Sequence, residues 1–468
     1  MHQNRIIIDK KFQIIGIITT SISTFITAFT GSASNIALPN IAADFNLNAV
    51  MLSWVTLSYM ITTAALVLPM GRISDIYGRK KIFIAGTIIF TIGSLLSAFS
   101  INIATLIIFR IIQGSGAAML FGTSIAILTN IFPQKKRGSA LGINTASVYI
   151  GLSAGPVIGG LLTNTYGWQS IFFICIPFGI LVVITALLFL KGEWNESSGE
   201  SFDLIGTFFY ALFLIALILG FSNITEKTGL ILTALSVLFF SGMIIVESKV
   251  KHPVFNLDLF RGNKAFTFSN IAALINYSAT FGVGFLMSLF LQSIKGFSPE
   301  KAGLILLTQP LIQALFSPLT GKLSDTIEPK ILASTGMILT TIGLFLFSFL
   351  KLDTPVYFII VSLITLGAGF ALFSSPNTNA VMRSIGKKHF GVGSATLSTM
   401  RIIGQILSLG IATLMFALLL GKAKIVLENQ MEFLKSINIT FRIFTILCFA
   451  GIFFSLIRGK VHKNRQED

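Results

Sequence analysis

The sequence predicts an all-α membrane protein whose chain crosses the bilayer fourteen times. Of its 468 residues, 53% are hydrophobic and only 11% are charged, whereas soluble proteins carry about 25% charged residues. Long apolar blocks recur along the whole chain, and their length suits helices that cross the hydrocarbon core. A soluble protein with so little charge would lack the polar residues needed to cover its surface.

The apolar blocks are separated by short charged or polar segments, which set the predicted spans. The spans are 12–38, 50–70, 82–99, 104–131, 138–163, 168–190, 203–222, 229–247, 265–292, 302–321, 331–350, 355–382, 391–419 and 437–457. The first block follows basic residues, as a signal peptide does. It is too long for the apolar region of a signal peptide and lacks a small-residue cleavage site, so we interpret it as a span.

The basic residues predict the orientation of the chain. With the N-terminus in the cytoplasm, the inside segments hold 24 Lys and Arg residues and the outside segments hold 8. Cytoplasmic loops of membrane proteins carry an excess of basic residues, so this bias places both termini in the cytoplasm of a multi-pass cell-membrane protein. We interpret the net charge of +16 in the same way and expect no nucleic-acid partner.

Two segments of the first half of the chain recur in the second half. GRISDIYGRKK (71–81) aligns with GKLSDTIEPK (321–330) at an offset of 250 residues. The glycine-rich segment 113–142 aligns with 366–398 at an offset of 253 residues. Two blocks in the same order at nearly one offset indicate an internal repeat.

The repeat predicts two six-helix halves with a helix pair inserted between them. Six spans with short loops need about 200 residues. The repeats are offset by 250 and 253 residues, so the residues in excess of 200 correspond to the middle helix pair. We expect an N-terminal half at 1–190, an inserted pair with flanking loops at 191–264, and a C-terminal half with a basic tail at 265–468. Paired halves with a binding site between them are typical of transporters.

The sequence contains no motif for a cofactor, a metal ion or an enzymatic reaction. The four histidines fall in polar segments without metal-ligand spacing, and no Gly-rich phosphate loop or Ser/His/Asp grouping is present. Cys175 and Cys448 lie in apolar runs, so we expect buried thiols rather than a disulfide. We therefore expect no cofactor and no enzyme.

The segment 71–81 lies between the second and third predicted spans, on the cytoplasmic side. Its glycines allow a tight turn. Asp75 is placed to meet a neighbouring helix N-terminus or a basic residue, while Arg72, Arg79 and Lys80 are placed to anchor at the lipid surface. The recurrence of the Gly–Ser–Asp core in the second half favours a structured latch over a plain basic loop.

The fifth predicted span carries a series of glycines. Gly142, Gly151, Gly155 and Gly159 are separated by nine, four and four residues, and we expect them to share one helix face. Small residues let helices approach closely, and Pro156 interrupts the hydrogen bonds of the helix. We expect this face to act as a hinge between the two halves.

Together these motifs resemble those of the major facilitator superfamily, in particular its branch of fourteen-helix drug:proton antiporters. The segment 71–81 is similar to the loop signature of that family, and the glycines of span five are similar to its antiporter motif. The other similar segments are RIIQGSGAAML, NIALPNIAADF, SWVTLSYMIT, GWQSIFFICIPFG and MRIIGQILSLGIA. The resemblance covers nearly the whole chain.

The resemblance implies alternating access by rocking of two halves, and export of lipophilic compounds coupled to proton entry, as in multidrug efflux. It implies that Asp75 and Arg79 belong to a cytoplasmic gate and that Arg110 and Gln113 take part in proton coupling. The partners it implies are the lipid bilayer, protons and a lipophilic small molecule, and we expect a monomer.

One position departs from the pattern of that branch. The branch has an acidic residue shortly before the Asn–x–Ala–Leu–Pro run, where this chain has Thr30, and none of the eighteen acidic residues falls inside a predicted span. A buried carboxylate would bind cations and carry a proton. The charges within the spans are instead Arg110 and Arg401, and arginine keeps its proton.

Three hypotheses for the function follow. In the first, the chain is a proton-coupled multidrug exporter with Asp44, at the outer mouth, as proton acceptor. In the second, an electropositive cavity exports or flips anionic or zwitterionic amphiphiles such as fatty acids, lysolipids or acidic drugs. In the third, the chain is a non-transporting membrane sensor, although such a protein would not be expected to keep both latches and the span-five glycines.

Polar residues within the spans are the candidates for contact with substrate. The alternative is hydrogen bonding between helices, worth about 0.6 kcal/mol for each bond. The candidates are Thr30, Asn35, Tyr59, Arg110, Asn144, Asn270, Asn276, Gln309, Gln313, Asn377, Asn379 and Arg401. For Arg110, which has no carboxylate nearby in the sequence, we expect water and substrate to be the partners.

Overall fold

The apolar blocks form long helices, because backbone groups in lipid must find their hydrogen bonds within the same segment. The computed structural model describes residues 10–46, 49–224, 226–255, 257–420 and 430–459. Within these residues every regular element is helical, and fourteen helical segments are long and apolar enough to cross a membrane. The prediction of an all-α protein with fourteen spans is confirmed. The terminal segments, for which we predict a cytoplasmic location, lie outside the described residues.

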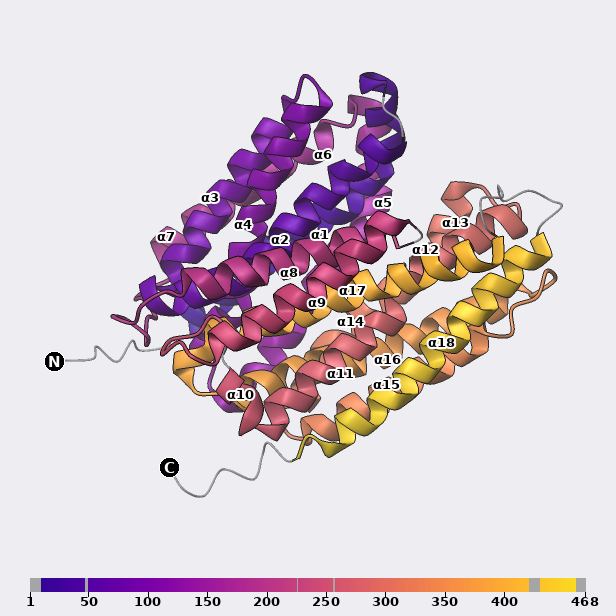
Figure 1. Cartoon of the computed structure of the whole chain (residues 1–468). Helices are drawn as coiled ribbons and strands as arrows, with labels where there is room; N and C mark the ends of the chain where they lie inside the picture. Colours follow the sequence, from indigo (N-terminus) through magenta and orange to yellow (C-terminus); the bar gives the residue numbers. More distant parts are fainter. Residues whose placement is uncertain (1–9, 47–48, 225, 256, 421–429, 460–468) are drawn as a thin grey trace.

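The first part of the chain folds into seven helices and one short turn of 3₁₀ helix. These are α1 (Lys10–Phe45), α2 (Ala49–Tyr77), α3 (Arg79–Ala98), α4 (Ile103–Ile131), η1 (Gln134–Lys136), α5 (Arg137–Tyr166), α6 (Ser170–Phe173) and α7 (Cys175–Phe189). They pack on one another and form the indigo and violet group in Figure 1. We call α1 to α7 the first group.

The last part of the chain forms a second group in the same way, coloured orange to yellow in Figure 1. Its elements are α11 (Lys264–Thr280), α12 (Gly282–Leu289), η2 (Phe290–Ile294), α13 (Pro299–Leu306), α14 (Thr308–Leu323), α15 (Pro329–Phe347), α16 (Val356–Arg383), η3 (Lys387–His389), α17 (Phe390–Leu420) and α18 (Gln430–Ile457). Several predicted spans consist of two consecutive helices, as α13 and α14 do.

Between the two groups in sequence lie α8 (Leu204–Ser222), α9 (Lys227–Glu247) and the short α10 (Leu257–Arg261). The helices α8 and α9 pack side by side, and α8 contacts α2 of the first group and α17 of the second. The groups also contact each other directly through the pairs α5–α14, α2–α17, α4–α17 and α5–α16.

The segment 71–81 is almost entirely helical, which differs from the predicted loop. The helix α2 continues to Tyr77, and α3 begins at Arg79, so Asp75 lies in the last turn of α2. Gly78 alone makes the turn, with φ of 118°, a conformation that residues with a Cβ rarely adopt. We call the end of the bundle that carries the segments 71–81 and 321–330 the basic end.

The glycines of α5 lie on two faces, so the prediction of one shared face is wrong. A Cβ at Gly151 or Gly155 would lie 2.6 Å from Phe25 O or 2.5 Å from Ser32 Cβ, both in α1, whereas a Cβ at Gly142 would lie 2.5 Å from Ser317 O in α14. Nine residues are about two and a half helical turns, which places Gly142 opposite the others.

Because the glycines of α5 lie on two faces, they do not form the single hinge face that we predicted. Gly151, Gly155 and Gly159 pack α5 on α1 within the first group, while Gly142 packs α5 on the second group. Pro156 lies on an exposed part of α5. The close contact between the groups at this helix therefore involves Gly142 and, nearer the start of α5, Gly138.

We predict that Gly151→Ala destabilises the folded protein by about 1–3 kcal/mol, because the added methyl group must displace α1. The matched control is Gly31→Ala in α1, where a Cβ meets nothing within 4 Å, and where alanine should stabilise the helix by roughly 0.5–1 kcal/mol. Thermal unfolding of the two purified variants in detergent measures the difference. Equal melting temperatures would contradict the proposed close packing of α5 on α1.

Candidate functional site

A buried carboxylate joins the two helix groups at the basic end. The side chain of Asp75 is wholly buried and accepts hydrogen bonds from the backbone N–H groups of Gly391, at 2.8 Å, and Val392, at 2.9 Å. It also accepts a hydrogen bond of 2.8 Å from Arg79 Nε. The first N–H groups of α17 have no partner within their own helix, and they carry the positive end of its dipole. Asp75 thus meets both a helix N-terminus and a basic residue.

Asp325 makes the corresponding contact from the second group to the first. Its carboxylate accepts hydrogen bonds from the N–H groups of Gly138, at 2.8 Å, and Ser139, at 2.9 Å, at the start of α5. Arg383 Nη2 lies 2.9 Å from the same carboxylate. Burial raises the pKa of Asp325 above its usual value, while the two N–H groups and Arg383 act in the opposite direction.

The two contacts are related by the internal repeat. Asp75 aligns with Asp325 and Gly138 aligns with Gly391, and each aspartate binds the helix that begins at the glycine of the other half. Close backbone approach is required at both places, because a Cβ on Gly391 or Gly138 would collide with the backbone of the opposite group. We call the two contacts the paired latches.

The second candidate feature is Arg110, which is wholly buried in α4. Its Nε donates to Val55 O in α2 at 3.1 Å, and its Nη1 donates to Gln113 Oε1. The ring centroids of Tyr59 and Phe172 lie 4.3 and 5.7 Å from its guanidinium carbon. These ring faces attract a cation. Protein groups therefore satisfy Nε and Nη1 of Arg110, and the water and substrate that we expect as partners stay a prediction for the remaining nitrogen.

Two neighbours complete this cluster. Gln113 donates to Ser94 Oγ in α3 at 2.7 Å, which links α4 to α3. The Nη2 group of Arg110 is buried and has no hydrogen-bond partner among the described residues. An unpartnered donor in a buried site carries a free-energy cost, so this nitrogen marks a position suited to a further acceptor.

Asp44 and Thr30 do not bind Arg110 directly. Asp44, at the end of α1, is exposed and accepts a hydrogen bond of 2.7 Å from Trp168 Nε1. The rings of Trp168 and Phe172 are in edge contact, so two aromatic rings stand between Asp44 and Arg110. Thr30 is wholly buried, donates to Ile26 O, and lies 3.0 Å from the Cys175 sulfur.

An aromatic cluster joins the two helix groups near Arg401. The ring of Phe370 in α16 lies 5.7 Å from that of Tyr149 in α5 and 5.2 Å from that of Tyr277 in α11. The guanidinium of Arg401 in α17 lies 5.6 Å from the Tyr277 ring and donates to Thr378 Oγ1 at 2.9 Å. Arg401 is half-buried, and its Nε has no hydrogen-bond partner among the described residues.

Sequence reasoning missed the aromatic members of this cluster, because the chain contains 44 phenylalanines and nothing distinguishes one of them. The seven tyrosines are a better signal, since a phenol within a span needs a polar neighbour. Tyr59 lies against Arg110, and Tyr277 lies against Arg401.

Most of the predicted substrate contacts are hydrogen-bonded to protein groups. Asn144 donates to Thr24 in α1, Asn270 donates to Phe266 O, and Asn377 donates to Ser269 O. The bonds of Asn144 and Asn377 join two helices and support the alternative of hydrogen bonding between helices, whereas the bond of Asn270 lies within α11. Asn276 differs, because it is wholly buried and both polar atoms of its side chain lack a partner among the described residues.

The remaining predicted contacts lie in different places. Asn35 is exposed and accepts a hydrogen bond from Thr56, Gln313 is buried in α14, and Gln309 is half-buried. Asn379 donates to Ser324, next to the latch at Asp325, so it belongs to the basic end.

A further buried arginine, Arg458, lies just beyond the last predicted span and was missed for that reason. Arg458, after α18, donates to Asn377 Oδ1 at 2.8 Å and to Pro329 O at 3.1 Å. Burial lowers the pKa of Arg458 to about 9. These bonds tie α18 to α16 and α15, so we assign Arg458 to the packing of the second group.

Within the described residues, the carboxylates of the candidate spans lie only at the span ends. Among the described residues, Asp75, Glu247 and Glu432 are the acidic residues that fall within the fourteen candidate spans, and each lies in the first or last turn. The interior of these spans therefore carries fixed positive charge and no negative charge. Two helix groups of this kind, joined by paired latches at one end, are typical of membrane transporters.

The chain belongs to the Major Facilitator Superfamily, whose family model matches residues 20–250 and 270–468. It is 34% identical to the riboflavin transporter RibZ of Clostridioides difficile, over 93% of this chain and 95% of that protein. It is 30% identical to the multidrug resistance protein Stp of Mycobacterium tuberculosis, over 86% of this chain and 76% of that protein. The resemblance to the multidrug-efflux type of this family is confirmed, and the chain is a multi-pass membrane transporter rather than an enzyme.

Solved structures agree with this fold. The human organic anion transporter MFSD10 matches with a TM-score of 0.71 at 12% identity, over 96% of this chain and 100% of that chain. The proton:xylose symporter XylE matches with a TM-score of 0.67 at 15% identity, over 95% of each chain. At these identities the likeness concerns the fold alone.

We predict that Asp75→Asn and Asp325→Asn each increase the population with a separated basic end by about tenfold or more. Hydrogen bonds to a charged group contribute roughly 1.5–3 kcal/mol, and 1.4 kcal/mol corresponds to a factor of ten. Spin labels on the two groups at the basic end measure this population by their distance distribution. The control is Asp353→Asn, which removes an exposed carboxylate. A shift for one aspartate and not for the other would contradict the equivalence of the latches.

Proposed function

We propose that the chain is a secondary active exporter of lipophilic aromatic compounds that are neutral or anionic. In this proposal the basic end faces the cytoplasm, the two helix groups rock about the centre of the bundle, and proton entry drives the cycle across the cell membrane. The charge of the substrate follows from our second sequence hypothesis, an electropositive cavity. The type of transport, proton-coupled export, follows from the first.

The observation that carries the substrate class is the charge of the span interiors. Away from their ends, the described spans hold Arg110, Arg401 and the exposed Arg442, and no carboxylate. A cationic substrate would meet these positive charges without compensation, and desolvating an uncompensated charge is costly. A neutral substrate avoids this cost, and an anionic substrate is attracted by the positive charges.

The aromatic cluster supports the second part of the substrate class. Tyr149 comes from the first group, and Tyr277 and Phe370 come from the second. Rings contributed by both groups suit a flat aromatic substrate, because aromatic pairs prefer offset or edge contacts at separations of about 4.5–7 Å. The half-buried Arg401, with its unpartnered Nε, stands next to these rings as a donor for an acceptor atom of the substrate.

Riboflavin is a second candidate substrate. Its support is the similarity to the riboflavin transporter RibZ, which extends over nearly the whole of both chains. The isoalloxazine of riboflavin is a flat, uncharged ring system with several acceptor atoms. It therefore fits the same combination of rings and an arginine donor.

We predict that reconstituted protein transports neutral and anionic aromatic dyes at least tenfold faster than a cationic dye of matched size under one pH gradient. Riboflavin is included in the same panel. Arg401→Gln should reduce transport of the anionic dye about tenfold or more and leave the neutral dye within about twofold, and Arg401→Lys should retain most of the anionic transport. Faster export of the cationic dye would contradict the proposal, whatever the result for riboflavin.

Proton coupling is tested separately at Asp44. We predict that Asp44→Asn abolishes transport driven by a pH gradient but keeps exchange of labelled for unlabelled substrate at equal pH, because exchange requires no net proton movement. The control is Glu432→Gln, which changes an exposed carboxylate at the start of α18. Gradient-driven transport by the Asp44 variant at the wild-type rate would show that another group carries the proton.

A further inference from the structure

The acidic linker 191–203 lies across the basic end without regular helix. Glu193 accepts hydrogen bonds from the backbone N–H groups of Lys80, at 2.8 Å, and Lys81, at 3.2 Å, at the start of α3. The Trp194 carbonyl accepts from Arg79 N at 3.1 Å. These bonds hold the first part of the linker on the first helix group.

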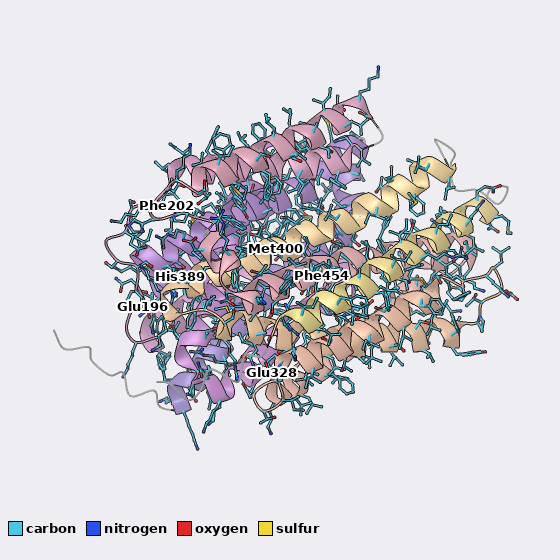
Figure 2. All side chains as sticks on the ribbon, turned by 60° about the horizontal axis from the view of Figure 1, so that its bottom comes forward. Glu196, Phe202, Glu328, His389, Met400 and Phe454 are labelled. Carbon is cyan, nitrogen blue, oxygen red and sulfur yellow. The ribbon has the colours of Figure 1, made fainter. Side chains whose placement is uncertain are left out.

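The next part of the linker contacts the latch of Asp75 itself. Ser197 N donates to the Asp75 backbone carbonyl at 3.1 Å, and Glu196 lies 3.2 Å from Arg79 Nη1. Figure 2 shows Glu196 and His389 at the same end of the bundle, the end where α17 begins. The linker is therefore built into the gate, and is not a free connection between α7 and α8.

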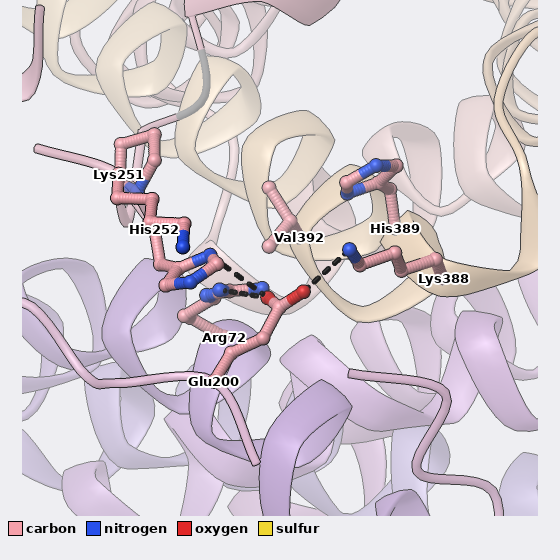
Figure 3. A pocket seen from close by; sticks show the side chains of 8 residues that line it. Arg72, Glu200, Lys251, His252, Lys388, His389 and Val392 are labelled. Carbon is pink, nitrogen blue, oxygen red and sulfur yellow. Dashed lines mark hydrogen bonds and ion pairs between the residues drawn. The ribbon is translucent and has the colours of Figure 1, made fainter. Parts of the chain in front are cut away.

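One linker residue, Glu200, contacts both helix groups and the segment after the inserted pair (Figure 3). Its carboxylate pairs with Arg72 in α2 and with Lys388 in η3. His252 Nδ1, in the segment that follows α9, lies 3.5 Å away. The hydroxyl of Ser197 adds a weaker bond, of 3.3 Å, to the Lys388 carbonyl.

Glu200 lies in a small cavity whose other charged or titratable side chains are basic. The small cavity at this junction is lined by Arg72, Lys251, His252, Lys388 and His389, and Glu200 is the acidic residue among its lining residues. Arg72 is 3% exposed, whereas the Lys388 side chain is 49% exposed, so the junction combines a buried cation with a partly solvated one. Without the carboxylate, Arg72 from one group and Lys388 from the other would repel each other across the junction.

Glu200 is ionised at physiological pH. Burial raises its pKa, but the hydrogen bonds and charges of Lys388 and Arg72 dominate and lower it to about 2. A lowered pKa stabilises the folded, closed arrangement above the ordinary pKa of about 4.3, and this contribution is lost only as the pH falls toward 2. The ion pairs of Glu200 therefore persist across the range in which the transporter works, and separation of the helix groups has to break them.

We propose that Glu200 is a gating residue that ties the two helix groups together, through the linker, only while the basic end is closed. The proposal rests on the alternating access proposed above. The linker bonds at Glu193, Trp194 and Glu196 are all to the first group. When the groups separate, the linker stays with α2 and α3, and the bonds that break are the ion pair of Glu200 with Lys388 and the weaker bond of Ser197 to the Lys388 carbonyl.

This arrangement gives the inserted helix pair a role in the cycle. The linker leads directly into α8, which contacts α2 and α17, and His252 belongs to the segment that leaves α9. Glu200 therefore connects the entry and the exit of the inserted pair to the gate. The pair acts as a third contact between the groups, beside the paired latches.

The experiment compares Glu200→Gln with Glu193→Gln, which makes the same chemical change on the same linker but at a residue that contacts the first group. Spin labels at Tyr77→Cys and Ile331→Cys report the separation at the basic end, because both side chains are exposed and belong to different groups. The two native cysteines are buried and leave the labelled positions distinguishable. Distances are measured without substrate, and thermal unfolding is measured for each variant.

We expect Glu200→Gln to increase the population with the longer distance by about threefold to tenfold, and Glu193→Gln to lower the melting temperature without this increase. Glu200→Asp should restore the short distance in part. Lys388→Gln should reproduce the effect of Glu200→Gln, and the double variant should add little to either change. Equal distance distributions for Glu200→Gln and the wild type would overturn the proposal, as would equal shifts for the two glutamate variants.

The readout separates this proposal from the proposed function. If Glu200→Gln shifts the distances while no compound of the dye panel is transported, the gate stands and the substrate assignment fails. If the dyes are transported as predicted while the distances do not respond to Glu200→Gln, the function stands and the gating role is wrong. Should Glu200→Gln fail to fold, Lys388→Gln removes the same bond from the other side, with Lys387→Gln as its control.

Discussion

The structure depends on a carboxylate that is removed from water and held by the N-terminus of a helix from the other half of the chain. Asp75 has lost its hydration, and a buried charge is tolerated only when it is fully hydrogen-bonded. The N–H groups of Gly391 and Val392 donate hydrogen bonds to this carboxylate only while α17 lies across the end of α2. The carboxylate is therefore satisfied in one arrangement of the two helix groups, which makes the contact conditional in the way that a gate requires.

Other features of the basic end follow from this constraint. The backbones must approach closely for an aspartate to reach two successive N–H groups, so glycines stand where the helices cross. The second latch repeats the arrangement with Asp325, the residue that aligns with Asp75 in the internal repeat. The acidic linker then neutralises the basic residues gathered at the same end, with Glu200 between Arg72 and Lys388.

The sequence predicted the spans, and it indicated Asp75 and the segment 321–330 as parts of latches, because hydropathy and repeated motifs are local patterns. It did not predict that Asp75 would meet Gly391, since an alignment of repeats identifies equivalent residues but not their contacts. Gly142 was assigned to the wrong face because the nine-residue interval to Gly151 is half a turn out of phase. The sequence did not indicate roles for Glu200 or Phe370. A glutamate in a polar linker and one phenylalanine among many have no sequence pattern that distinguishes them.

In the closed state the two aspartates hold the amides of the opposing helices. Hydrogen exchange resolved to single amides, at Gly391, Val392, Gly138 and Ser139, tests this contact most directly. We expect slow exchange at all four amides without substrate, and a joint increase when either Asp75 or Asp325 is replaced by asparagine. Fast exchange of these amides in the wild type, or an increase confined to the helix next to the substituted residue, would contradict it.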